Sequence, residues 1–275
     1  MVQEYLPFII GLVLICGVSF WDDVKSLPDS LRLVFQFAAM ALVFYGWGIL
    51  QWDMWWAIII ALIVCVGITN VYNFMDGING INGGYTFAVL APLAWLNGSS
   101  SSMVQGFVDQ RLIIVALLAD LVFCFFNYRP KGKAKCFAGD VGSVGAAFIV
   151  IYVLGKLILT TGDFTWIVFL VVYGVDACLT IFHRIMLHEN LGQAHRKHAY
   201  QLMANELGME HTVVSTIYTV LQLVIACGMI AIPNTAGWHW GYLVVVALVL
   251  CVAYVVFMKK YYHLHEEYLA SLNKK

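Results

Sequence analysis

The chain has 275 residues, of which 62% are hydrophobic and 11% are charged, and its mean hydropathy is +0.84. Soluble globular domains are about 45–50% apolar and about 25% charged, so this composition excludes a soluble domain, a disordered chain and a nucleic-acid-binding protein. It is typical of an all-α, polytopic helical bundle in a lipid bilayer. The seven scattered cysteines form no Cys-x-x-Cys or Cys/His cluster, so they indicate neither a disulfide framework nor a zinc site.

Nine apolar stretches approach the roughly 17–25 residues that a helix needs to cross a bilayer. They are Tyr5–Trp21, Leu33–Leu50, Trp55–Val71, Tyr85–Asn97, Leu112–Phe126, Val144–Leu159, Trp166–Phe182, Val213–Ile232 and Trp240–Met258. The fourth is the weakest because it is short and contains Pro92. No basic segment precedes the first stretch, which therefore predicts a span and not a signal peptide. We expect one integral membrane domain over residues 1–275.

The distribution of Lys and Arg predicts how the chain is oriented. With nine spans, one set of alternating loops and the C-terminal tail holds 13 of the 15 Lys and Arg residues. Because basic residues concentrate on the cytoplasmic side, the N-terminus is expected outside and the C-terminus inside. The same loops combine acids, Asn, Gly and His, so chemistry is expected at the cytoplasmic face.

Two adjacent carboxylates, Asp22 and Asp23, end the first stretch. Such a pair beside the lipid headgroups is costly unless cations balance it. The two acids could hold Mg²⁺, or one could act as a base. A solvated helix end with Lys25 as the partner is the alternative.

Asn70, Asn73 and Asp76 follow one another at three-residue spacing at the end of the third stretch. If the helix continues, all three project from one face and form a polar surface suited to a nucleotide or a hydrated metal. Gly77 and Gly80 allow a tight turn or a close approach of the backbone to a ligand. A capped helix end followed by a turn is the alternative.

Asp140 lies between glycines where the sixth stretch begins. An Asp at a helix N-terminus can hold a metal, while the free N–H groups face an anion. Lys133 and Lys135 precede it and suit a phosphate. Alternatively, Asp140 is an N-cap and the lysines only mark the cytoplasmic side.

The longest inner loop follows Arg184 and contains the string His195-Arg196-Lys197-His198. Such a cluster can clamp a diphosphate through charge-assisted hydrogen bonds. A zinc site lacks further ligands nearby. A basic loop that touches anionic lipid is the alternative.

Two acids, Asp120 and Asp176, lie within spans, which makes them functional candidates. Asp120 could simply pair within the bundle. Asp176 precedes Arg184 by about two helical turns, so the two side chains could belong to one site.

Together these segments resemble the polyprenyl-phosphate N-acetylhexosamine-1-phosphate transferase superfamily, glycosyltransferase family 4. The matching segments are Asp22-Asp23, the Asn70/Asn73/Asp76-Gly77 segment, residues 137–143, and Asp176 with the His195-Arg196-Lys197-His198 string. They occur in the family's order. The last string looks more like the branch that uses simple UDP-N-acetylhexosamines than the translocase branch, which has three consecutive histidines.

The resemblance implies a bacterial inner-membrane enzyme with its site on the cytoplasmic face. It would transfer N-acetylhexosamine-1-phosphate from a UDP-sugar to undecaprenyl phosphate, release UMP, and so start a cell-envelope glycan such as O-antigen. Mg²⁺, with Mn²⁺ as a substitute, is the implied cofactor, and a homodimer stays open. The implied metal ligands are Asp140 and Asp23, and the implied catalytic acids are Asp22, Asp23 and Asp76. The implied substrate-binding residues are Asn70, Asn73, Lys133, Lys135, Arg184, His195, Arg196 and His198.

Two alternatives remain at this point. Family members usually carry two further spans before the one that leads into Asp22-Asp23, so an inactive, shortened transferase is one. A secondary transporter or channel is the other, favoured by the acids within spans, although no internal repeat supports it.

Overall fold

A computed structural model describes residues 2–50, 52–100, 104–190 and 196–272, and this part of the chain consists of helices and connecting segments, with no strand. The elements are α1 (Val2–Val24), α2 (Asp29–Gly46), η1 (Trp52–Met54), α3 (Trp55–Phe74), α4 (Ile81–Gly98), α5 (Gln110–Asn127), α6 (Gly139–Thr161), η2 (Phe164–Leu170), α7 (Val171–Met186), α8 (Ala199–Gln201), η3 (Leu202–Glu206), α9 (His211–Ala231) and α10 (Ala236–Leu272). The all-α prediction is therefore confirmed.

Seven helical segments of the described chain are long and apolar enough to cross a membrane. The other two predicted spans are present as the helices α2 and α4, each 18 residues long, but they do not meet that criterion. The protein is membrane-spanning, while the count of nine spans and the orientation stay predictions.

Two helix boundaries differ from the expected ones. The predicted span Trp166–Phe182 begins as the 3₁₀ segment η2 and becomes α-helical only from Val171. The last helix, α10, continues past Met258 to Leu272, so its final turns extend beyond the apolar stretch and pack beside the loop that follows α7. Tyr262 and Tyr268 of this extension lie against Lys197 and Arg196 of that loop, which explains why the helix does not stop where the hydrophobicity stops.

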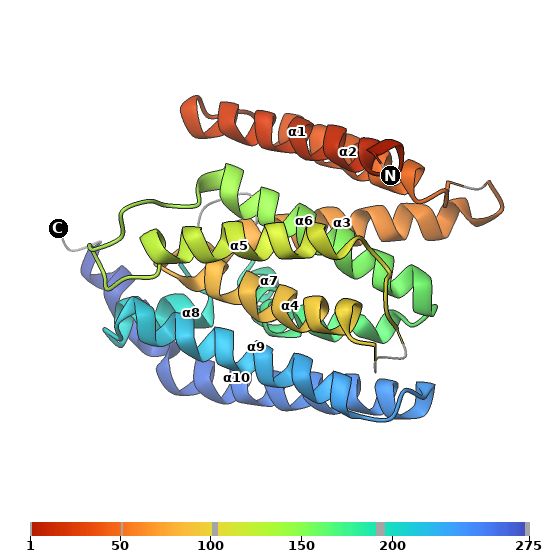
Figure 1. The fold of residues 1–275 in the computed structure, drawn as a ribbon. Helices are drawn as coiled ribbons and strands as arrows, with labels where there is room; N and C mark the ends of the chain where they lie inside the picture. The colour runs from red at the N-terminus through yellow and green to blue at the C-terminus, as the bar shows by residue number, and fades with distance from the viewer. Residues whose placement is uncertain (1, 51, 101–103, 191–195, 273–275) are drawn as a thin grey trace.

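Helix α4 is the central helix of the bundle (Figure 1). It packs against α9, α5 and α6, and nearly all of its side chains are buried. Because neighbouring helices cover it, α4 needs less apolar character than a lipid-facing helix. This burial explains why the weakest of the predicted spans nevertheless forms a complete helix.

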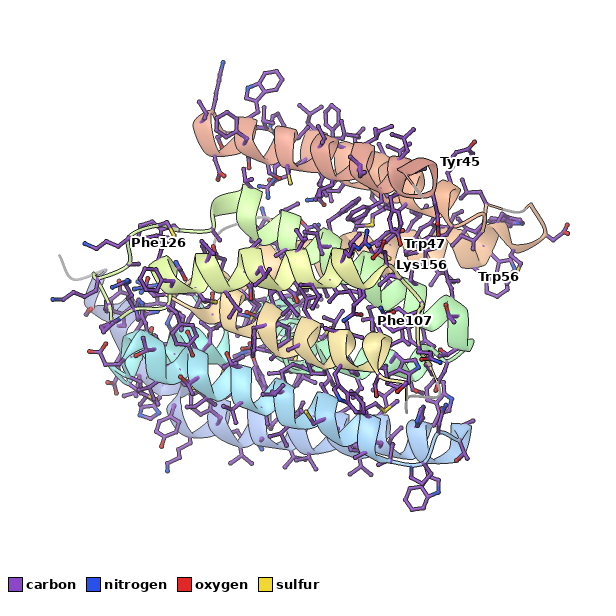
Figure 2. All side chains as sticks on the ribbon, viewed as in Figure 1. Tyr45, Trp47, Trp56, Phe107, Phe126 and Lys156 are labelled. Carbon is purple, nitrogen blue, oxygen red and sulfur yellow. The ribbon has the colours of Figure 1, made fainter. Side chains whose placement is uncertain are left out.

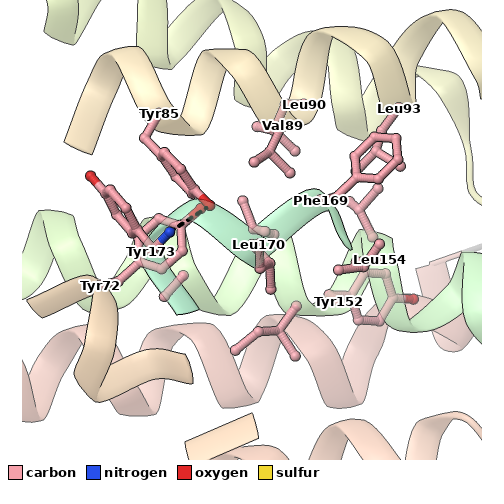
Figure 3. Packing of buried hydrophobic residues seen from close by; sticks show 14 of the residues in the cluster. Tyr72, Tyr85, Val89, Leu90, Leu93, Tyr152, Leu154, Phe169, Leu170 and Tyr173 are labelled. Atoms are coloured by element: carbon pink, nitrogen blue, oxygen red, sulfur yellow. Dashed lines mark hydrogen bonds between the residues drawn. The ribbon is translucent and has the colours of Figure 1, made fainter. Parts of the chain in front are cut away.

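Stacked tyrosines connect α3, α4 and α7 in the core (Figure 3). The rings of Tyr85 and Tyr173 are parallel, with centroids 3.5 Å apart, and Tyr72 meets Tyr173 edge-on at 5.3 Å. The Tyr85 hydroxyl donates to Oε1 of Gln222, and the Tyr173 hydroxyl donates to the carbonyl of Ile81. The buried hydroxyls of Tyr85 and Tyr173 therefore have partners, and the aromatic faces fix how the three helices approach.

Successive helices run in opposite directions, so every second connection meets at one end of the bundle, hereafter the polar end. The polar end contains the C-termini of α1, α3, α5 and α7 and the N-termini of α2, α4, α6 and α9. Exposed aromatic side chains, including Tyr45 and Trp56, project near the opposite end (Figure 2). Aromatic residues near the ends of membrane-spanning helices are typical of a membrane–water interface.

Candidate functional site

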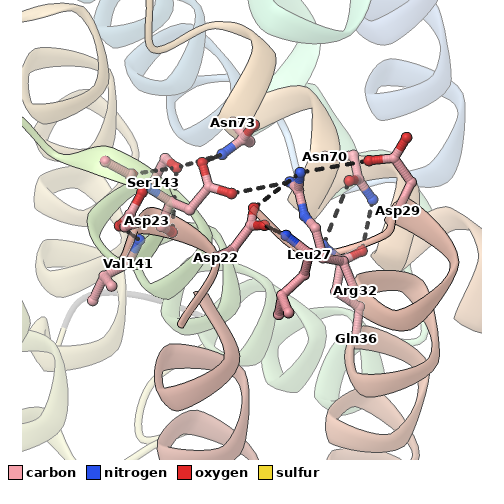
Figure 4. A network of polar contacts seen from close by, with 12 residues as sticks. Asp22, Asp23, Leu27, Asp29, Arg32, Gln36, Asn70, Asn73, Val141 and Ser143 are labelled. Atoms are coloured by element: carbon pink, nitrogen blue, oxygen red, sulfur yellow. Dashed lines mark hydrogen bonds and ion pairs between the residues drawn. The ribbon is translucent and has the colours of Figure 1, made fainter. Parts of the chain in front are cut away.

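Four polar side chains from four helices meet at the polar end (Figure 4). Arg32 of α2 lies between two acids: its Nη1 is 3.2 Å from Oδ2 of Asp22, and its Nη2 is 3.1 Å from Oδ2 of Asp140. Asn73 of α3 donates from Nδ2 to Oδ1 of Asp140 at 2.7 Å and to the Ser143 hydroxyl at 3.1 Å. We call Asp22, Arg32, Asn73 and Asp140 the acid network. Segments separated by more than one hundred residues thus share one site.

Asp23, the second acid of the pair, stabilises the start of α6. Its carboxylate accepts the backbone N–H groups of Asp140 at 3.0 Å and of Val141 at 3.2 Å. Gly139 has φ +59° and packs against this carboxylate, so a side chain there would be strained and would also collide with it. An acid at a helix N-terminus satisfies otherwise unpaired N–H groups and interacts favourably with the helix dipole. Asp23 therefore fixes the position of Asp140, and its expected role as a metal ligand stays a prediction.

Asn70 does not share the environment of Asn73. Its Nδ2 donates to Oε1 of Gln36 at 2.7 Å and to the carbonyl of Val66 at 2.8 Å, which joins α3 to α2. Helix α3 ends at Phe74, so Asp76 lies beyond it. The stripe through all three residues required the helix to continue past Asp76. It does not, so the alternative, a helix end followed by a turn, describes this segment. Asn73 and Asp76 still face the same region of the molecule.

Asp76 adjoins the acid network and has an unusual charge environment. Burial, followed by the negative charges of Asp140 and Asp23, raises the pKa of Asp76 to about 7. No hydrogen bond or ion pair to its carboxylate is found within the described ranges. A carboxylate that is crowded by like charges and lacks a partner is suited to accept a cation.

The segment after His198 packs against the residues on either side of Asp76 through Tyr200. The hydroxyl of Tyr200 donates to the carbonyl of Phe74 at 2.9 Å. A Cβ at Gly77 would lie 2.3 Å from that hydroxyl, so only glycine allows this contact without movement. The sequence signal was the glycine after Asp76, but nothing in the sequence identified Tyr200 as its neighbour.

Asp176 is the centre of a second, buried polar cluster. Its Oδ1 accepts from the backbone N–H of Ala199 at 3.1 Å and lies 3.1 Å from Nδ1 of His198. Its Oδ2 accepts from the hydroxyl of Tyr218 at 2.5 Å, and Thr180 donates to Oδ1 at 3.2 Å. We call these five residues the Asp176 cluster. Sequence reasoning identified Asp176 and His198 but neither Thr180 nor Tyr218, since isolated hydroxyls in apolar helices give no distinctive pattern.

The described contacts of Arg184 are with the loop that follows α7, and the suggestion that it shares one site with Asp176 stays a prediction. Its Nε is 3.1 Å from Oε2 of Glu189, and its Nη2 donates to the carbonyl of Asn190 at 2.6 Å. Lys197 also pairs with Glu189. Arg184 is buried, and these contacts hold the two ends of the loop together. A role in substrate binding stays a prediction.

The remaining predicted binding residues are less constrained. Lys133 and Lys135 are exposed in the connection between α5 and α6. Arg196 lies over the ring of Tyr268, with its guanidinium carbon 5.9 Å from the ring centroid. His195 lies outside the described residues. Arg32, which was not among the predicted binding residues, is the cation that pairs with both Asp22 and Asp140 in the acid network.

Among the described residues, no group of three or more His, Cys, Asp or Glu side chains is arranged to hold a metal ion. The donor chemistry nevertheless suits a hard divalent cation, because the oxygen atoms of Asp22, Asp76, Asp140 and Asn73 gather in one region. Arg32 supplies the positive charge between two of these acids.

The amino-acid sequence matches the model of the family "Glycosyl transferase family 4" over residues 5–158, more than half of the chain. The matched range contains the acid network and Asp76. It ends before Asp176, so the Asp176 cluster belongs to the part outside the match.

Curated relatives agree with the family match. The chain is 24% identical over 248 residues to the probable undecaprenyl-phosphate N-acetylglucosaminyl 1-phosphate transferase of Bacillus subtilis (strain 168), covering 83% of this chain and 66% of the relative. It is 36% identical over 115 residues to the phospho-N-acetylmuramoyl-pentapeptide-transferase of the same organism, covering 39% and 32%. The corresponding transferase of Shouchella clausii (strain KSM-K16) is 33% identical over 109 residues, covering 38% and 30%.

The chain spans about two thirds or less of the length of these relatives. The match over residues 5–158, together with the agreement among the relatives, shows that the chain belongs to glycosyl transferase family 4.

Proposed function

We propose that the protein transfers N-acetylhexosamine-1-phosphate from a UDP-sugar to undecaprenyl phosphate, giving undecaprenyl-diphospho-N-acetylhexosamine and UMP. The observation that carries the proposal is the acid network, in which residues from α1, α2, α3 and α6 converge beside Asp76. Family membership supports a phospho-sugar transferase, and the names of the relatives supply the substrate class.

The reaction joins two anions, so electrostatics dominates its barrier. An oxygen of the lipid phosphate attacks the β-phosphorus of the UDP-sugar. The bond from that phosphorus to the oxygen bridging the two phosphates breaks, and the oxygen leaves as part of UMP. A related phosphate monoester loses its last proton with a pKa of about 6, so a strong base is not required near neutral pH.

The acid network suits the positioning of these anions more than the removal of a proton. Arg32 spans Asp22 and Asp140, and an incoming phosphate would compete with the two carboxylates for its guanidinium. Asp23 fixes the helix end that carries Asp140, and Asn73 orients its carboxylate. Asp22 also accepts the backbone N–H of Leu27, so the turn after α1 is held in place. The site is therefore built before substrates arrive.

We propose that Asp140 and Asp76 hold Mg²⁺, which Mn²⁺ could replace. When bound, the cation would neutralise charge on the diphosphate. Asp76 is suited to this role because burial and the nearby acids leave its carboxylate without a compensating charge. Asn73, which bonds Asp140, would keep that carboxylate aimed at the site.

The segment around His198 would bind the sugar or the diphosphate. Asp176 holds His198 and the backbone of Ala199, and Tyr200 connects the same segment to the end of α3. Arg196 and His195, with the exposed Lys133 and Lys135, would attract the nucleotide. A site at one end of the bundle lets a lipid from the bilayer meet a soluble nucleotide. We place this end on the cytoplasmic face of a bacterial inner membrane because the basic loops cluster there.

The test uses the purified full chain with polyprenyl phosphate, Mg²⁺ and tritiated UDP-GlcNAc, and it measures label in butanol-extractable lipid. We expect incorporation by the unmodified chain and a loss of about 100-fold or more in Asp140→Asn, because charge stabilisation at such centres has this magnitude. Asp163→Asn, at the opposite end of the bundle, is the control. A transporter would give no labelled lipid, and near-normal incorporation by Asp140→Asn would contradict the assigned role.

A further inference from the structure

A cavity of about 420 Å³ lies between α1, α4, α5 and α6. Its lining begins at Ala138, beside the start of α6, and reaches Leu12, Leu90 and Ile149. Ile149 is ten residues into α6, which corresponds to a depth of about 15 Å at 1.5 Å per residue. This is about half the roughly 30 Å thickness of a bilayer's hydrocarbon core. The cavity therefore extends from the polar end toward the middle of the membrane.

Lipid would enter this cavity between α1 and α5, two of the helices that line it. Helix α1 packs on α2 and α6, and α5 packs on α4, whereas no extensive packing joins α1 to α5 within the described chain. Figure 1 shows these two helices apart. The lining is mostly apolar and includes small residues such as Ala116, Ala146 and Gly145, which leave room for a hydrocarbon chain.

Two polar atoms in this apolar lining have no partner. Oγ1 of Thr86 and Oδ2 of Asp120 are buried and make no hydrogen bond in the part of the chain that the structure describes. Thr86 is only 3% exposed. The buried hydroxyl of Tyr72 lies behind this lining, near both Thr86 and Asp120. Unsatisfied polar groups are costly where no water can reach them, so a partner is expected from outside the chain.

Asp176 shows that this fold satisfies buried acids when they are structural. Four donors surround Asp176, whereas one oxygen of Asp120 has none among the described residues. The proposed transfer reaction uses neither Asp120 nor Thr86. Their open hydrogen-bonding capacity is therefore available for a separate ligand.

We propose that the cavity binds an uncharged long-chain alcohol from the bilayer, with its hydroxyl bonded to Asp120 and Thr86 and its chain along the apolar walls. A hydroxyl offers one donor and two acceptor lone pairs, which match a carboxyl oxygen and a threonine hydroxyl. An uncharged head avoids bringing a second ionic group into the hydrocarbon layer. A plain hydrocarbon would fill the space but leave both atoms without partners.

The test uses the full chain in nanodiscs and two diazirine probes with the same chain, one derived from hexadecanol and one from hexadecane. Mass spectrometry of labelled peptides locates the adducts. We expect the alcohol probe to label the segments lining the cavity about threefold to tenfold more than the hydrocarbon probe, the ratio that one hydrogen bond supports. Competition by unlabelled hexadecanol and by geranylgeraniol distinguishes a straight-chain from a polyisoprenoid alcohol as the source.

Asp120→Leu and Thr86→Val remove one polar atom each and should bring the two probes toward equal labelling. Thr86→Val preserves side-chain shape, so it stays informative if Asp120→Leu fails to fold. Thr69→Val is the matched control, because the buried Thr69 hydroxyl bonds the carbonyl of Cys65 on its own helix and does not line the cavity. Equal labelling by both probes in the unmodified chain, or an unchanged preference in both variants, would overturn the proposal. Neither readout depends on transferase activity.

Discussion

The acid network and the Asp176 cluster are built from the same kinds of residues but differ in how completely they are enclosed. In the acid network, the side chains of Asp140 and Arg32 are 22% and 23% exposed, and Arg32 forms ion pairs with both Asp22 and Asp140. In the Asp176 cluster, the acid is 3% exposed and has four donors. A half-open ionic site can exchange partners with a phosphate, whereas an enclosed, satisfied site supports the fold.

The largest expected change in stability comes from the enclosed cluster. Asp176→Ala leaves His198, Ala199 and Tyr218 with unsatisfied groups in the core. We expect a loss of about 3–5 kcal/mol, seen as a large fall in the apparent Tm of the detergent-solubilised protein. Asp53→Ala, on an exposed residue, should change stability by no more than about 0.5 kcal/mol. If Asp176→Ala unfolds like the unmodified chain, the proposed division between the two sites is wrong.

Arg32 is the residue that tests the open site most directly. Arg32→Lys keeps one positive charge but loses the planar fork that spans Asp22 and Asp140. We expect lipid labelling to fall about 10- to 100-fold while the apparent Tm changes little, because the ion pairs are partly exposed. A matched drop in both activity and stability would indicate that Arg32 is structural instead.

Gly77 lies where Tyr200, from the segment after His198, meets the end of α3. A substitution there should lower activity only by displacing that segment. Gly77→Ala places a methyl group 2.3 Å from the Tyr200 hydroxyl, so the His198 segment must move away from Asp76. We expect about a tenfold loss of lipid labelling, since small displacements of positioned groups are costly. Adding Tyr200→Phe removes the hydroxyl oxygen with which the new methyl group collides, and this second substitution should recover part of the activity. No recovery would show that the strain lies elsewhere.

Asn70 should give the smallest effect, although sequence reasoning grouped it with Asn73. Its amide pairs with Gln36 between α2 and α3, so Asn70→Ala should cost about 1 kcal/mol of stability and change lipid labelling less than about threefold. Asn73→Ala in the same assay is the comparison, and we expect it to be the more damaging. A larger loss of activity in Asn70→Ala would return Asn70 to the substrate-binding set.

Much of this arrangement was predictable from the sequence, because membrane spans and polar segments are local patterns. Apolar stretches of sufficient length gave the helices, and alternating loops placed Asp22, Asp76 and Asp140 at a common end. The network Asp22–Arg32–Asp140 confirms that acids distant along the chain come together, and Asp76 lies within electrostatic reach of it.

What sequence reasoning missed depends on three-dimensional contacts. The contact of Asp23 with the first N–H groups of α6 depends on how α1 and α6 meet in space, which no spacing rule contains. The separation of Asn70 from Asn73 follows from where Gln36 lies on a neighbouring helix, and the partners of Asp176 are hydroxyls with no sequence signature. The low hydropathy of α4 was compensated by its central position.

The most direct test of the central claim follows the β-phosphate of the nucleotide sugar. UDP-GlcNAc labelled with radioactive phosphorus at the β-position is incubated with the full chain, Mg²⁺ and polyprenyl phosphate, and the label is traced. We expect the label to enter the lipid together with the sugar, unlabelled UMP to be released, and Asp140→Asn to abolish both. Sugar-labelled lipid with the phosphorus label retained in UDP, or full transfer by Asp140→Asn, would contradict it.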